Sequence, residues 1–332
     1  MDIKKLPKIE LHLHLDCSLS YDVVQILDPR VTREEYDRDF IAPARCTNLA
    51  EFLRCAPRGF GLMQSEASLT LVVEDLFRQL AADNIIYAEI RFAPLLHLEG
   101  GLTPEQVVRI TDEATARMIS STGIEARLIL CTLRHYTAEQ SLETAKLVQQ
   151  FKGTRVTALD IAADEAGFPL APHVEAYRYA REHNLFRTAH AGEALGPESV
   201  WETLRLLAPT RIGHGTRSYE DSALVEHLKQ ERIHLELCPT SNVQIIPSIE
   251  TWQQHPIDLL YRAGVPLNIN TDGRMCTPTN MNKEYEGMST VFHWTTKEFL
   301  ATNLMAIEAA FCEEALKTQL RSTLSTAYTQ TT

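Results

Sequence analysis

The sequence of 332 residues lacks the features that mark membrane and secreted proteins. No apolar run approaches the roughly 18 residues that a membrane-spanning helix needs. The N-terminus reaches charged residues within a few positions, so we expect no signal peptide. Seven cysteines are scattered without a CxxC pair, and this odd number argues against a disulfide framework. We therefore expect a soluble, cytoplasmic globular protein.

Positive charge is also scarce, because 32 lysines and arginines stand against 44 aspartates and glutamates, for a formal net charge of −12. Such an acidic chain has no general attraction for nucleic acid or for an anionic membrane. Neither GxGxxG nor GxxxxGK[ST] occurs, which argues against dinucleotide-dependent redox chemistry and against a phosphate-binding loop. A small molecule is the expected partner, and the sequence does not indicate an oligomeric state.

Hydrophobic residues make up 44% of the chain, enough for a large core, and short apolar runs alternate with helical patterns. The predicted strands are Ile9–Leu15, Ile85–Phe92, Ala126–Leu133, Val156–Ala162, Phe186–His190, Arg211–His214, Ile233–Cys238 and Val265–Thr271. The predicted helices include Ser68–Ala81, Pro104–Ile119, Ala138–Phe151, Pro172–His183, Pro197–Leu207 and Ser222–Gln230. Strands that alternate with helices form right-handed βαβ units around a parallel sheet. Eight strands predict the α/β class and one (β/α)₈ TIM barrel over residues 1–332.

Two segments are additional to the eight strands and eight helices of a minimal barrel. Residues 18–63 form an insertion after the first strand, and it would lie at the C-terminal mouth of the barrel, where a lid belongs. A surface excursion without a lid function fits the pattern equally well. Thr296–Leu320 predicts one or two closing helices, and Ser325–Thr332 is expected to fray.

Histidines and a carboxylate stand at or near the ends of several predicted strands. His12 and His14 are two residues apart on the first strand, so both side chains point to the same side of it. His190 ends the fifth strand and Asp272 follows the eighth. Because burying several unpaired polar groups is costly, a shared metal ion explains them best. Imidazoles with one carboxylate and no thiolate favour Zn²⁺, with Fe²⁺, Mn²⁺ or Co²⁺ as alternatives.

Two further residues are candidates for acid/base chemistry. Glu193 follows His190 by three residues, and a carboxyl beside a metal ligand suits a proton shuttle, although a lone glutamate is commonly a solvated surface charge. His214 lies between Gly213 and Gly215, so little blocks its ring. It would act as a further ligand or as a base that orients water. A catalytic zinc lowers the pKa of its water to about 7, which makes hydrolysis the natural reaction.

Six ordered motifs resemble the adenosine deaminase family of the amidohydrolase superfamily. They read LPKIELHLHLD (6–16), LDIAADE (159–165), HAGE (190–193), RIGHGT (211–216), ELCPTSN (236–242) and NTD (270–272). The run YAEIRF (87–92) is similar as well. The resemblance extends from residue 6 to about residue 275. It implies a hydrolase that converts adenosine or 2′-deoxyadenosine to the inosine product and ammonia.

By the same resemblance, one zinc ion per chain would be held by His12, His14, His190 and Asp272. A single metal is expected, because the superfamily's two-metal members bridge their ions through a lysine or carboxylate on strand four, and Val156–Ala162 contains no lysine. That missing bridge also disfavours amide or phosphoester hydrolysis.

The resemblance also implies roles around the substrate. Glu193 would protonate ring nitrogen N1, and His214 would orient the hydroxide that attacks C6. Asp16 would hold a ribose hydroxyl, the Ala163 N–H would meet a ring nitrogen, and His14 would border the substrate. Alternatives are the same chemistry on adenine or on a 5′-modified adenosine such as aminodeoxyfutalosine, and a binding relative that has lost catalysis.

Three positions depart from the family pattern. Cys17 and Ala163 stand where glycine is common, and we expect Cys17 to be unreactive filler. Gly273 replaces a second aspartate, in some members asparagine, that contacts purine N7. A buried hydrogen bond to substrate can decide specificity, so this substrate-binding position bears on which aminopurine is used. Arg274 and Asn280 are candidates for a substitute contact.

The remaining candidates are apolar residues of the insertion and isolated histidines. Two roles fit the apolar side chains of the insertion: an apolar wall over the ribose, or an ordinary helix core. The residues are Phe52, Phe60, Leu62 and Met63. Surface or capping positions are expected for His97, His135 and His255.

Overall fold

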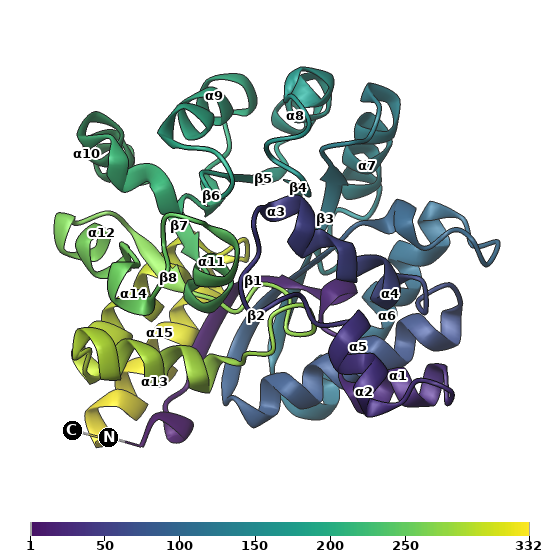
Figure 1. The fold of residues 1–332 in the computed structure, drawn as a ribbon, viewed down its shortest axis with the longest axis horizontal. Coiled ribbons are helices and arrows are strands. Elements are labelled where there is room, and N and C mark those ends of the chain that lie inside the picture. The colour runs from purple at the N-terminus through teal and green to yellow at the C-terminus, as the bar shows by residue number, and fades with distance from the viewer. Residues whose placement is uncertain (1, 332) are drawn as a thin grey trace.

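Eight parallel strands, paired in the order of the sequence, form the centre of the computed structural model, which describes residues 2–331 (Figure 1). Their bounds are β1 Lys8–His14, β2 Ile85–Phe92, β3 Glu125–Leu133, β4 Val156–Ala162, β5 Phe186–Ala191, β6 Arg211–His214, β7 His234–Leu237 and β8 Leu267–Ile269. An isolated parallel bridge joins Leu13 to Asp272, just beyond β8, and so brings the last strand back to the first. The predicted (β/α)₈ barrel is confirmed.

Helices surround the sheet (Figure 1). Those that follow the strands are α5 Glu66–Ala82, α6 Pro104–Thr122, α7 Ala138–Gln150, α8 Val174–Glu182, α9 Pro197–Leu207, α10 Ser222–Gln230 and α12 Ile257–Ala263. The predicted helices therefore fall within a few residues of the observed ones. Local signals explain this agreement, since a capping box starts α6 at Thr103 and another starts α7 at Thr137.

The insertion after β1 forms four short helices: α1 Tyr21–Leu27, α2 Arg33–Asp39, α3 Leu49–Phe52 and α4 Ala56–Phe60. Figure 1 shows α3 and α4 lying over the strands. Another short helix, α11 Pro239–Ile245, follows β7, and α13 Met281–Phe292 follows the segment after β8.

The C-terminal segment closes the fold with α14 Thr296–Ala309 and α15 Glu314–Thr331. The expected fraying of Ser325–Thr332 is wrong for the described residues, because α15 continues to Thr331. The reason is burial: the Tyr328 side chain is 2% exposed and its hydroxyl accepts a hydrogen bond from Asn303. Thr332 lies outside the described residues. Within 2–331, none of the helices combines the length and apolar character needed to cross a membrane.

Candidate functional site

A cavity of about 360 Å³ lies among residues that follow the C-terminal ends of the strands. Its lining includes every predicted site residue except His12: His14, Asp16, Ala163, His190, Glu193, His214, Asp272 and Gly273. The polar residues come from the ends of β1, β5 and β6 and from the segment after β8. This end of the barrel is where enzymes of this fold place their active sites.

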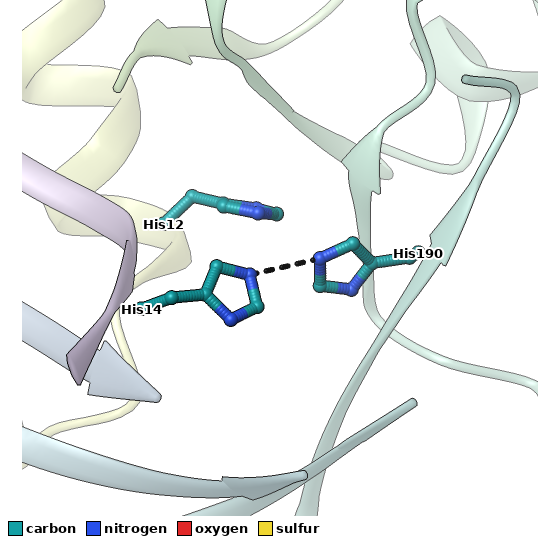
Figure 2. Close-up of side chains that lie close together, drawn as sticks. All are labelled: His12, His14 and His190. Carbon is teal, nitrogen blue, oxygen red and sulfur yellow. Dashed lines mark hydrogen bonds between the residues drawn. The ribbon is translucent and has the colours of Figure 1, made fainter. Parts of the chain in front are cut away.

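Three imidazoles meet at the floor of the site (Figure 2). His12 and His14 project from β1, and His190 faces them from β5, with 3.2 Å between the Nε2 atoms of His14 and His190. The ring centres of His12 and His190 are 4.6 Å apart. Gly213 of β6 makes room for them, because a Cβ there would lie 3.0 Å from the His12 ring and 3.2 Å from the His190 ring.

The outer nitrogens of two imidazoles face carboxylates. His12 Nδ1 lies 2.8 Å from Glu236, and His190 Nδ1 lies 3.1 Å from Asp160. Burial opposes ionisation of Glu236, but Arg91 and Arg211 outweigh it and lower the Glu236 pKa to about 2. An ionised carboxylate accepts a hydrogen bond from the Nδ1–H group, so the Nε2 lone pairs point into the site.

The Nε2 atoms that face into the site are suited to binding a cation. Burial, reinforced by neighbouring positive groups, lowers the pKa of His12 and of His14 well below the usual value, so both are neutral. The buried Nε2 of His12 has no hydrogen-bond partner. Asp272 Oδ1 lies 3.6 Å from His14 Nε2 and 3.8 Å from His12 Nε2, and Asp272 Oδ2 accepts a 2.6 Å hydrogen bond from Ser241. Converging imidazole lone pairs beside one carboxylate are the donor set that zinc prefers.

Glu193 and His214 lie beside this cluster, with Oε1 of the glutamate 3.4 Å from Nε2 of the histidine. Burial, with the nearby charges of Asp272 and Glu165, raises the pKa of Glu193 well above its usual value. Burial therefore favours the protonated form of the Glu193 carboxyl. Burial lowers the pKa of His214, and its Nδ1 lies 3.1 Å from the Asn242 amide. A protonated carboxyl and a neutral imidazole are thus available for proton transfer.

Glu165 is a site residue that the sequence did not reveal. Its buried carboxylate accepts hydrogen bonds from four successive backbone N–H groups, those of residues 192–195, at 2.6–3.2 Å, and another from the Ser199 hydroxyl. These bonds hold the turn that carries Glu193. Glu165 lies inside the LDIAADE motif, but nothing in that motif indicates where its side chain points.

The carboxylates behind the imidazoles were likewise not predicted. Asp160 and Glu236 both bind the Arg91 guanidinium, at 2.8 and 2.6 Å. Arg211 of β6 binds Glu236 on the neighbouring strand β7 and Glu89 on β2, which is not a neighbouring strand. All of these side chains are fully or almost fully buried, so they form an ion-pair layer inside the barrel. Charged residues within otherwise apolar strand runs are the sequence feature that could have indicated this layer.

Asp16 and Ala163 stand on the substrate side of the cavity. Asp16 Oδ2 accepts a hydrogen bond from the Ala93 N–H at 3.0 Å, and burial raises the Asp16 pKa to about 6. Ala163 adopts a positive φ of 77° at the end of β4. Arg274 and Asn280 do not line the cavity. Arg274 binds Glu10 and Asp83 instead, and Asn280 caps α13, so neither offers the substitute contact.

The apolar candidates of the insertion all pack in or against the core, and two of them also line the cavity. Phe52 and Phe60 are those two, whereas Met63 is fully buried in the core and Leu62 packs against it. His135 is exposed and lines the cavity.

A surface position is wrong for His97 and His255, which are both buried, but a capping position is confirmed. His97 is the C-cap residue of the 3₁₀ helix Pro94–Leu96, and His255 is the C-cap residue of the 3₁₀ helix Trp252–Gln254. His97 Nδ1 lies 3.1 Å from the Met63 carbonyl, and His255 Nε2 lies 3.2 Å from Asn242, the residue that orients His214.

The chain is similar to a family model, to a relative by sequence and to two solved structures. The family model described as adenosine deaminase matches residues 7–327. The adenosine deaminase of Clostridium perfringens (strain 13 / Type A) is 31% identical over 328 residues, which cover 97% of this chain and 98% of that protein. Among solved structures, an adenine deaminase from Arthrobacter aurescens is similar with a TM-score of 0.88 and 25% identity, over 96% of this chain and 98% of the other. The Arabidopsis N6-mAMP deaminase gives a TM-score of 0.87 and 26% identity, over 98% and 99%.

Proposed function

Because the chain belongs to the adenosine deaminase family, we propose that it hydrolyses the 6-amino group of adenosine or 2′-deoxyadenosine to give the inosine product and ammonia. The observation that carries this proposal is the meeting of two kinds of group in one cavity. Neutral imidazoles point their lone pairs inward, and Glu193 keeps a transferable proton beside them. Hydrolytic deamination needs both an activated water and a proton donor.

One zinc ion would be held by His12, His14, His190 and Asp272. The orphaned Nε2 of His12 and the short contact between the other two imidazoles support this ligand set. Zinc bound there supplies Lewis acidity that brings the pKa of a water molecule near 7.

Glu193 donates its proton to purine N1, which makes C6 more electrophilic. His214 orients the attacking water, since Asn242 fixes its ring with Nε2 toward Glu193. Glu165 holds the Glu193 backbone, so the proton donor needs no rearrangement during the reaction. Ammonia then leaves C6, and the product carries an oxygen in its place.

The cavity favours a nucleoside over a nucleotide. No lysine or arginine lines it among the residues that the structure describes. A 5′-phosphate would therefore find no cationic partner there. Asp16 accepts the Ala93 N–H through Oδ2, and its carboxylate has the capacity to accept a further hydrogen bond from a ribose hydroxyl. The free base would leave that carboxylate unused.

The insertion would serve as a lid. Leu49, Phe52, Ala56 and Phe60 of α3 and α4 line the cavity opposite the polar strand ends. Apolar side chains over a reaction site exclude water when they close. We infer one catalytic domain over residues 1–332, with residues 18–63 as its movable part.

Ammonia release from a panel of 6-aminopurines tests the proposal. Adenosine and 2′-deoxyadenosine should exceed AMP and adenine in kcat/KM by about 100-fold or more. A preference for AMP or adenine would overturn the nucleoside assignment. No ammonia from any member, with metal bound and the protein folded, would overturn the reaction itself.

A further inference from the structure

Two backbone segments that border the cavity are locked side by side. One is the turn after β1 that carries Cys17, and the other is the segment after β8 that carries Gly273. The Asp272 N–H donates to the His12 carbonyl at 2.9 Å, and the Met275 N–H donates to the Cys17 carbonyl at 2.8 Å. Hydrogen bonds on both sides of Gly273 therefore fix its distance from the turn.

At this distance, the space between the segments holds only one side chain. A Cβ at position 273 would lie 2.7 Å from the Cys17 Cβ and 3.0 Å from the Cys17 carbonyl oxygen. Gly273 does not have a left-handed φ. Its lack of a side chain therefore reflects space rather than backbone conformation.

We propose that Cys17 and Gly273 are a coupled specificity-determining pair, in which the Cys17 side chain occupies the wall space that a residue 273 side chain would otherwise take. This inference rests on the proposed aminopurine deaminase function. It joins two departures from the family pattern, 256 positions apart, into one structural exchange.

Because of this exchange, the substrate would contact the Cys17 side chain at this part of the cavity instead of a side chain at position 273. Cys17 and Gly273 both line the cavity, and Cys17 is partly exposed to it. A hydrogen bond with Cys276 lowers the pKa of Cys17, but burial and the neighbouring Asp16 outweigh it and raise the pKa to about 11. The wall is therefore a neutral thiol, a weak hydrogen-bonding group. Shape rather than a strong hydrogen bond decides which aminopurines fit there.

The packing claim is tested with three variants. Gly273→Asn adds a polar side chain without adding charge beside Asp272, and it should lower Tm by about 5 °C or more through overpacking. Cys17→Gly in the Gly273→Asn background should recover at least half of that loss, because it removes the Cβ that collides. Cys17→Ala in the same background is the matched control, since alanine removes the thiol but keeps the Cβ. It should recover little.

The specificity claim is tested with adenosine and 7-deazaadenosine, which lacks N7. The native chain should use both with kcat/KM values within about tenfold of each other, because its thiol wall makes no strong contact there. The Cys17→Gly/Gly273→Asn variant should widen the preference for adenosine by at least about tenfold. An unchanged ratio would overturn the specificity role.

Failure of the proposed function can be told apart from failure of the pair. If the native chain deaminates no aminopurine, the proposed function fails, and the Kd values of the two nucleosides in the same variants measure specificity instead. If neither the Kd ratio nor the kcat/KM ratio changes, the specificity role of the pair is wrong. Equal Tm recovery by Cys17→Ala and Cys17→Gly would overturn the competition for space.

Discussion

The cavity has a polar wall at the strand ends and an apolar wall on the insertion helices, and the two are held in place differently. In the polar wall, His12, His190, Glu193 and Asp272 each have a defined partner through a side chain or through their backbone. Directional bonds of this kind fix atoms to within fractions of an ångström, which proton transfer and metal coordination require.

The apolar wall depends on packing between two anchors. The Cys46 N–H donates to the Gln244 carbonyl at 2.8 Å before α3, and the Gln64 side chain donates to the Leu96 carbonyl at 2.9 Å after α4. Between the anchors, α4 meets the barrel closely at Gly59, where a Cβ would lie 2.7 Å from Met275. Contacts without directional bonds can separate and re-form cheaply. Under the proposed function, the polar wall would carry out the chemistry and the apolar wall would control access to it.

The largest expected effect comes from removing a proposed metal ligand from the polar wall. His190→Ala removes the Nε2 atom that lies 3.2 Å from His14 Nε2 and leaves the ligand set incomplete. Zinc content should fall to background and deamination below detection, because an open ligand shell holds the ion weakly. Elemental analysis and ammonia release measure both. A full complement of zinc in the folded variant would show that His190 is not a ligand.

The next largest effect distinguishes loss of proton transfer from loss of metal binding. Glu193→Gln keeps size and polarity but removes the transferable proton, so kcat should fall by about 10²–10⁴. Zinc content should stay at the native level, which distinguishes this variant from His190→Ala. His214→Gln should lower kcat similarly if His214 orients water, and should lose zinc if it is a ligand. Near-native turnover by Glu193→Gln would eliminate Glu193 as the proton donor.

Much of the polar wall could be predicted from the sequence, because its groups sit at strand ends. The two-residue spacing of His12 and His14 places both on one side of β1, and parallel strands bring His190 to the same end of the barrel. The carboxylates behind them could not be assigned. Glu236 meets His12 across 224 positions, and only the closed barrel brings these strands together.

The apolar wall was less predictable for a physical reason. Its helices are short, so their periodicity is too brief to define a buried face. Phe52, Phe60 and Met63 look equivalent in sequence, yet of the three only the phenylalanines line the cavity. The contact between Cys17 and Gly273 was similarly hidden, because neither residue has a pattern that points to the other.

A moderate effect should follow from loosening the turn under Glu193. Glu165→Gln replaces an acceptor of four backbone N–H groups with an amide whose NH₂ cannot accept them. Unfolding free energy should fall by about 1–3 kcal/mol, and kcat by about tenfold through misplacement of Glu193. Denaturant titration and steady-state kinetics measure these changes. Asp164→Asn is the matched control: the Asp164 side chain accepts only the Gly167 N–H, so its stability change should stay below about 1 kcal/mol. Equal losses in both variants would contradict the special role of Glu165.

The smallest effect should come from the apolar wall. Phe60→Leu keeps the wall apolar but removes part of a ring that lines the cavity, so substrate and transition state should lose similar contact. KM should rise by about three- to tenfold while kcat stays within about twofold, the pattern of lost uniform binding. Phe168→Leu is the matched control, because Phe168 is 41% exposed and does not line the cavity. In steady-state kinetics with adenosine, the Phe168→Leu variant should show the native kcat and KM. A fall in kcat at constant KM in Phe60→Leu would mean that the insertion takes part in the chemical step, and the division between the two walls would no longer hold.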